Sequence, residues 1–367
     1  MAYTQETRTY TALFTATLDD HRAELADQVH DAIPLIWFLK NRGRGRDRGA
    51  GRGIRMYTGG ARIKIPVISV KNPNVKSYSK YENLTVNASD EMTVGIEDMK
   101  NLATAVGISG EEMDQNRGLA AKRDLLRDKL DIAEIGLKEE FERQLVQGEV
   151  ASGALFMEPG NSGKDMNPLG AIIIKDPTDT QTLHGITQAE TWWANKVKQG
   201  AAAGAAAGSL EFVTEMNNLY HQCAMGSTGD APDVGISDMY YYEYYETTMM
   251  NNQRYINRDE AATTAGFDNV RFKNMTLFWS EYVPSLGTDT TTADVTKTQS
   301  ADEATAFFLN TRWLSLVISD AVNFIATPFV EPYDQDAIWS KILVRAQFIT
   351  NQRRKLGCHF AVDTTAP

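Results

Sequence analysis

Cysteine is scarce, and long apolar runs are absent. The 367 residues include only two cysteines, Cys223 and Cys358, which lie far apart and cannot form a disulfide framework, as suits a reducing cytoplasm. The best apolar runs, 171–174 and 314–318, are strand-sized and far short of the roughly 18 residues of a bilayer-crossing helix. Met1–Tyr10 lacks the features of a secretory signal. We therefore expect no membrane association, and activity in the compartment where the chain is made.

Catalytic and cofactor motifs are also missing. Gly163-Lys164 lacks both the following Ser/Thr and the preceding glycine of a phosphate loop. His221 and Cys223 are two residues apart on an expected helix, where their side chains do not face each other, so a buried cysteine is favoured over a nucleophile–base pair. The five histidines belong to no HExxH or CxxC pattern. We expect no enzyme, no metal and no cofactor.

The net charge of −11 argues against general affinity for nucleic acid. One tract is the exception, because NRGRGRDRGAGRGIR sets six arginines and five glycines against one aspartate. These arginines are Arg42, Arg44, Arg46, Arg48, Arg52 and Arg55. The tract could touch packaged nucleic acid, pair with an acidic patch on a neighbouring subunit, or be a solvated linker. We favour the subunit contact, since the chain carries excess acid elsewhere.

The first third of the chain predicts an arm, a ribbon and a long helix. Apolar spacing predicts a helix over 18–39 that Pro34 breaks or kinks. Alternation over 61–70 predicts an edge strand, with an antiparallel return over 75–94, and such a ribbon needs something else to lie on. A stripe of leucines predicts one helix over 111–147, capped by Ser109 and the acidic residues after it.

The remainder predicts a mixture of strands and helices without regular alternation, which favours an α+β fold. Strands are expected over 153–159, 170–177, 233–237, 270–279, 307–318 and 336–363, and helices over 209–225 and 239–255. Asp238 is expected to cap the second of these helices. Its tyrosines could stack on bases, but a role in core and interface is more usual. The pair Trp192-Trp193 is likewise expected to pack.

The order of these elements resembles that of the Hong Kong 97-like major capsid proteins of tailed bacteriophages. Four phrases carry the resemblance: ISGEEMDQNRG (108–118) before the spine helix, GITQAETWWANKV (185–197), ATPFVEPYDQDA (326–337) and NQRRKLG (351–357). The resemblance implies an N-arm at 1–52, an E-loop at 53–106, a peripheral domain with the spine helix at 107–180, an axial domain at 181–332 and a return to the peripheral domain at 333–367.

The function that the resemblance implies is self-assembly. Hexamers and pentamers would close into an icosahedral phage head around double-stranded DNA, made in the host cytoplasm and retained in the virion. The implied partners are further copies of the chain, a portal, separate scaffold or decoration proteins, and DNA contacted non-specifically. Too few residues precede the first helix for a built-in scaffold. Lys76 and Lys80 lie in the implied E-loop, but no partner asparagine is identifiable, so crosslinking is not predicted.

Two alternatives remain. The chain could be an encapsulin-like compartment shell or another phage structural protein, sharing the fold without packaging a genome. It could also be a hydrolase with a nonstandard site, which would require a cleft of perturbed titratable groups. Nothing in the sequence supports the second alternative.

Overall fold

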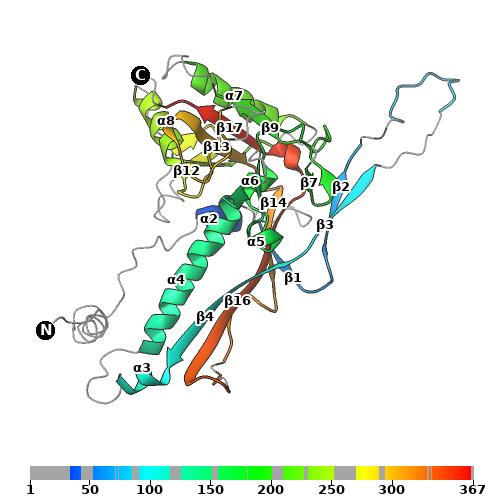
Figure 1. Ribbon diagram of the computed structural model, residues 1–367. Helices are drawn as coiled ribbons and strands as arrows, with labels where there is room; N and C mark the ends of the chain where they lie inside the picture. Colours follow the sequence, from blue (N-terminus) through cyan, green and yellow to red (C-terminus); the bar gives the residue numbers. More distant parts are fainter. Residues whose placement is uncertain are drawn as a thin grey trace. The chain divides into compact units, whose positions relative to one another are not determined.

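The computed structural model describes most of the chain (Figure 1). The described residues are 34–42, 53–70, 72, 74–84, 91–115, 125–150, 156–179, 181–200, 210–226, 230–251, 270–288, 294–328, 330–331 and 333–364. Helices and strands follow one another without regular alternation, which confirms the α+β prediction. No helix in these ranges has both the length and the apolar character needed to cross a membrane. The chain divides into two compact units.

The smaller unit contains Asn101–Glu142 and Ala321–Arg345. Strands β4 (Lys100–Ser109) and β15 (Ile325–Ala326) pair with the first half of β16 (Ala337–Thr350). The buried side chains of β4 and β16 in this unit include Val106, Ile108, Ile342 and Val344. Helices α3 (Gly110–Gln115) and α4 (Leu125–Val146) complete the unit, and the chain passes into the larger unit within α4 and within β16.

The start of α3 is a capping box. The Glu112 amide donates to Ser109 Oγ, the Ser109 amide donates to the Glu112 carboxylate, and both distances are 3.2 Å. The predicted cap is therefore confirmed. The helix predicted over 111–147 is confirmed where the structure describes it, in α3 and α4. Residues 116–124 lie outside the described residues.

The larger unit is organised around a six-stranded sheet in the order β11-β12-β10-β13-β17-β9. These strands are β9 (Lys196–Gln199), β10 (Val234–Ser237), β11 (Val270–Phe272), β12 (Met275–Trp279), β13 (Ala304–Leu309) and β17 (Gly357–Val362). The strand predicted over 270–279 is instead the hairpin β11–β12, which turns at Lys273 with a φ of +53°. Strand β13 lies at the centre of the sheet, and all its residues are buried.

Two helices cover one face of this sheet, α7 (Leu210–Ala224) and α8 (Met239–Asn251). Their apolar side chains form one core cluster with alternate residues of β13, Ala304, Ala306 and Phe308. Asp238 caps α8 by accepting a 2.7 Å hydrogen bond from the Tyr241 amide, as predicted. Tyr241 and Tyr245 are buried in the cluster, so the tyrosine-rich helix is core.

A second group of strands begins with β1 (Ile54–Tyr57), which lies parallel to β14 (Leu314–Ser319). Strand β14 pairs antiparallel with the second half of β16. Helix α2 (Pro34–Arg42) packs Phe38 on Phe278 with ring centroids 5.1 Å apart. Pro34 is the first residue of α2, where proline needs no amide partner, in line with the break predicted at this position. The rest of that prediction, 18–33, lies outside the described residues.

Short elements fill the segment after α4. They are β5 (Glu149–Val150), β6 (Met157–Glu158), α5 (Gly160–Gly163), α6 (Leu169–Ile172), β7 (Thr182–Leu183) and β8 (Ile186–Thr187). Two 3-10 turns lie later in the chain, Ala301–Glu303 before β13 and Arg353–Lys355 before β17. The strand predicted over 170–177 is wrong, because its apolar start forms the buried helical turn α6. An apolar run this short does not distinguish a strand from a buried helix.

Strands β2 (Ile63–Ile68) and β3 (Met92–Glu97) form an antiparallel hairpin of their own (Figure 1, blue and cyan). The edge strand predicted over 61–70 is confirmed as β2, with alternate residues buried. The returning strand was predicted too early, over 75–94, whereas it begins at Met92.

Candidate interaction surfaces

One face of the hairpin β2–β3 is apolar and exposed. The register places Ile68 opposite Met92 and Pro66 opposite Val94, and all four are exposed, Ile68 by 72% and Val94 by 51%. Ile96 continues this row along β3. The other face of β2 is buried. A row of exposed apolar side chains on one face of a ribbon is typical of an interaction site. We call these five residues the hairpin face.

The connection between the two strands is exposed as well. Residues 72 and 75–84 are all exposed, including Tyr81 at 91%. Lys76 Nζ lies 2.9 Å from Glu82 Oε1, and this hydrogen bond lowers the pKa of Glu82, together with a bond from the Ser79 amide. The tip residues 75–84 therefore have local polar contacts but no buried side chain.

The base of the hairpin, by contrast, is held by buried polar groups. Glu97, the last residue of β3, lies 2.8 Å from His184 Nδ1, and its second carboxylate oxygen accepts a 3.2 Å hydrogen bond from Gln347. Burial raises the pKa of Glu97, but neighbouring groups, led by the hydrogen bond from His184 and including the charge of Lys100, together lower it further than burial raises it. Glu97 is therefore an anion held at the point where the exposed ribbon meets buried strands.

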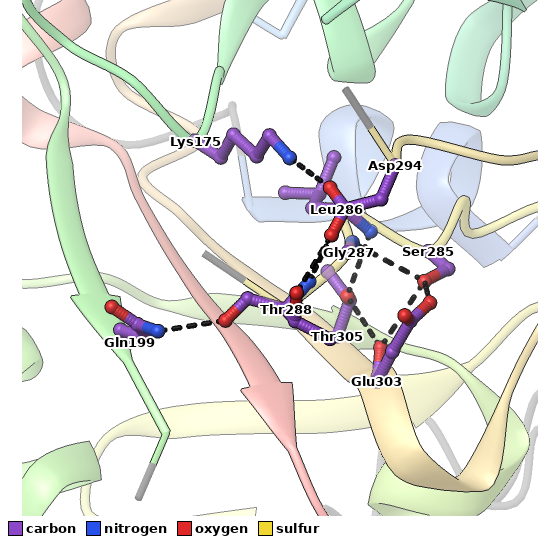
Figure 2. A network of polar contacts seen from close by, with 9 residues as sticks. All are labelled: Lys175, Gln199, Ser285, Leu286, Gly287, Thr288, Asp294, Glu303 and Thr305. Carbon is purple, nitrogen blue, oxygen red and sulfur yellow. Dashed lines mark hydrogen bonds and ion pairs between the residues drawn. The ribbon is translucent and has the colours of Figure 1, made fainter. Parts of the chain in front are cut away.

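A second polar network holds the loop after β12 (Figure 2). Lys175 is fully buried and pairs with Asp294, which also accepts hydrogen bonds from the amide and hydroxyl of Thr288. Burial raises the pKa of Asp294, while Lys175 and Thr288 lower it further than burial raises it. Gln199 donates to the Thr288 carbonyl at 2.7 Å. Every polar group named here has a partner within the chain, so we interpret the network as structural.

The residues considered for chemistry do not form a reactive site. Cys223 and Cys358 are both buried, and burial raises the pKa of the Cys223 thiol to about 12, well away from a reactive thiolate. His221 Nε2 lies 3.1 Å from Lys273 rather than near a nucleophile. Trp193 is buried, in line with the packing interpretation. Among the residues the structure describes, no group of histidine, cysteine or carboxylate side chains could hold a metal ion.

The arginine tract falls mostly outside the described residues. Arg44, Arg46, Arg48 and Arg52 lie there, whereas Arg42 is the last residue of α2. Arg55 lies in β1 opposite Val317 and is half-buried. The structure therefore leaves the tract a prediction. Sequence reasoning named the ribbon but missed its apolar face and the contact of Glu97 with His184. The alternation of apolar residues in β2 could have indicated the apolar face, whereas no local sequence pattern indicates the contact of Glu97 with His184.

Comparison with known proteins gives matches in structure alone. No protein-family model matches the sequence, and no curated protein matches it. The capsid of a native GTA particle matches over 95% of this chain and 98% of its own, with a TM-score of 0.52 and 9% identity. The holo-SrpI encapsulin complex from Synechococcus elongatus matches over 100% of this chain and 98% of its own, with a TM-score of 0.51 and 9% identity.

The chain has the Hong Kong 97-like capsid fold. The fold that the resemblance implied from the order of elements is thereby confirmed. Within this fold, β2–β3 corresponds in sequence position to the expected E-loop, and α4 to the expected spine helix. The ends of the five expected segments stay predictions.

Proposed function

We propose that the chain is the major capsid protein of a tailed-phage-type particle, assembling as hexamers and pentamers into an icosahedral shell around double-stranded DNA. The observation that carries the proposal is the hairpin face, in a chain with a capsid fold. A two-stranded ribbon is marginal in water by itself, and covering its apolar side chains with a second copy would stabilise both. The role is structural rather than catalytic.

The same proposal assigns the other partners. Assembly would take place in the host cytoplasm and leave the chain in the virion, with a portal and with separate scaffold or decoration proteins where the particle needs them. DNA would be contacted non-specifically, because a net charge of −11 limits adhesion to a polyanion.

Assembly can be tested by changing the hairpin face. The full chain is expressed alone and examined by size-exclusion chromatography and negative-stain microscopy, where we expect rings or closed shells. Ile68→Asp with Val94→Asp should abolish them without moving the urea midpoint of the subunit, because both residues are exposed. Ser79→Asp at the exposed tip adds the same kind of charge and is the matched control. Normal shells from the double variant would contradict the proposal.

A chain that stays monomeric alone is then expressed with the neighbouring genes of its genome, since a separate scaffold can be required. A monomer that persists in that experiment would also contradict the proposal.

The arginine tract is proposed as an inter-subunit contact. Replacing Arg44, Arg46 and Arg48 by alanine should impair shell closure and leave the subunit folded, because the tract then no longer meets the acidic surface of a neighbour. Normal shells from that variant would count against the contact.

An encapsulin-like compartment is the second candidate, favoured by the structural match to an encapsulin complex. The contents of purified shells separate the two: nuclease-protected DNA supports the phage head, and a co-purifying protein without DNA supports the compartment.

A further inference from the structure

His184 occupies a turn position that is suited to other residues. It joins β7 to β8 in a two-residue loop with Gly185, and the φ angles are +56° for His184 and +74° for Gly185. Loops with both residues in the left-handed region strongly favour asparagine, aspartate or glycine at the first position. Histidine adopts this region more readily than most side chains, but the conformation still costs free energy that other contacts must offset.

The imidazole makes two hydrogen bonds that a smaller side chain would not. Its Nε2 lies 3.2 Å from the Thr350 amide, which can only donate, so Nε2 accepts. The proton is thereby assigned to Nδ1, which donates to Glu97 Oε1 at 2.8 Å. The ring is buried, with the Trp193 ring centroid 6.2 Å from its own. His184 therefore links the end of β3 to the end of β16.

Gln347 of β16 also binds Glu97. Its amide nitrogen donates to Glu97 Oε2 and to the Asp98 carbonyl, both at 3.2 Å. Its amide oxygen accepts 3.0 Å hydrogen bonds from the amides of Asn167 and Phe348. All four hydrogen-bonding positions of this buried side chain are thus used, which leaves it no alternative orientation of equal energy.

The backbone of β3 also lies directly against the turn. The Ile96 amide donates to the His184 carbonyl at 3.0 Å. A Cβ at Gly95 would lie only 3.1 Å from His184 Cβ, so the glycine permits this close approach. Residues 95–97, at the end of β3 farthest from the exposed tip, are therefore fixed by three successive contacts.

We propose that His184 is a positioning residue, which with Glu97 and Gln347 forms a clamp that sets the direction of the hairpin β2–β3. The clamp would present the hairpin face in one orientation, so that a second copy meets an ordered surface and less conformational entropy is lost on assembly. The identity of the surface that the hairpin face binds depends on the proposed function, whereas the existence of the clamp does not.

The test measures the direction of the hairpin within one subunit. Lys80→Cys at the exposed tip and Glu243→Cys on α8 carry spin labels, and the two native cysteines are buried. Labelled full-length chain is diluted with excess unlabelled chain, so that only distances within a subunit are recorded by pulsed electron resonance. The variants are His184→Asn and Glu97→Ala. Glu82→Ala, which removes a carboxylate from the same hairpin away from its base, is the matched control.

We expect a narrow distance distribution for the parent and for Glu82→Ala. In both clamp variants, the fraction of subunits outside that narrow range should rise about tenfold, as the loss of a charge-assisted hydrogen bond implies. The urea midpoint of His184→Asn should fall less than that of Glu97→Ala, because asparagine suits the turn. Distributions as narrow as the parent's in both variants would overturn the clamp, and so would a fall in the midpoint of His184→Asn without broadening.

The two proposals fail separately in this experiment. Broadened distributions in a chain that never assembles would support the clamp and overturn the proposed function. If the chain forms shells but its clamp variants keep a narrow distance distribution, the proposed function is supported and the clamp is overturned.

Discussion

The six-stranded sheet and the hairpin β2–β3 use similar apolar residues but complete their burial in different ways. All residues of β13 are buried, and alternate ones pack under α7 and α8 on one face of the sheet. On the same sheet, Phe278 of β12 stacks on Phe38 of α2. Strand β2 is buried on one face only, and its exposed face aligns with that of β3. One region therefore obtains its stability within the chain, whereas the other has apolar surface left for a partner.

The largest effect is expected in the sheet. Phe308→Ala removes a fully buried ring from the core cluster and should lower the free energy of unfolding by about 4 kcal/mol. Ile68→Ala on the hairpin face should change it by less than about 0.5 kcal/mol, because that side chain is 72% exposed. Urea denaturation of unassembled subunits measures both. Equal losses would show that the hairpin stabilises the subunit as the sheet does.

A smaller effect, dependent on pH, is expected at His359 in β17. Its Nδ1 lies 2.8 Å from the Tyr241 hydroxyl and its Nε2 3.3 Å from Glu215, which also faces Lys198. Burial lowers the pKa of His359, although Glu215 raises it. The folded chain therefore binds this proton less readily than the unfolded chain, and the contribution of His359 to stability is lost as the pH falls below about 6.5.

The measurement compares the parent with His359→Gln at pH 7.5 and 5.5. As the pH falls, the free energy of unfolding of the parent should decrease by up to about 1.4 kcal/mol per pH unit more than that of the variant, where its pH dependence is steepest. Taking the difference is necessary because burial raises the pKa of Asp238 to about 7, so that stability from this group is gained as the pH falls. Parallel losses in the two proteins would show that His359 does not titrate on unfolding.

The sheet and its helices were largely predictable from local sequence. The apolar periodicity of α7 and the capping aspartate before α8 act within a few residues, and both predictions are confirmed. The start of α3 was predictable for the same reason, since Ser109 and Glu112 satisfy each other's amides. Where the apolar run was short and fully buried, as at α6, pattern could not separate helix from strand.

The hairpin was predictable only in part. Strand β2 shows a clear alternation, because one of its faces is buried and the other is exposed. In β3 the buried position is Gly95, which has no apolar side chain, so periodicity does not indicate where the returning strand begins. The clamp was beyond sequence reasoning, because Glu97 and His184 are 87 residues apart and neither belongs to a motif. Strain at His184 shows only once the turn is known.

The smallest effect is expected at the hairpin tip, where the comparison is sharpest. Lys76→Ala removes the ion pair with Glu82 and a hydrogen bond to the Asn83 carbonyl, all among exposed residues. Exposed pairs of this kind contribute little, because water solvates both charges nearly as well and holding two long side chains costs entropy. The urea midpoint of the subunit should therefore stay at the parent value at both low and high salt. A lower midpoint at low salt that disappears at high salt would show that the tip stabilises the subunit through charge, and the hairpin would then no longer be a region whose stability depends on a partner.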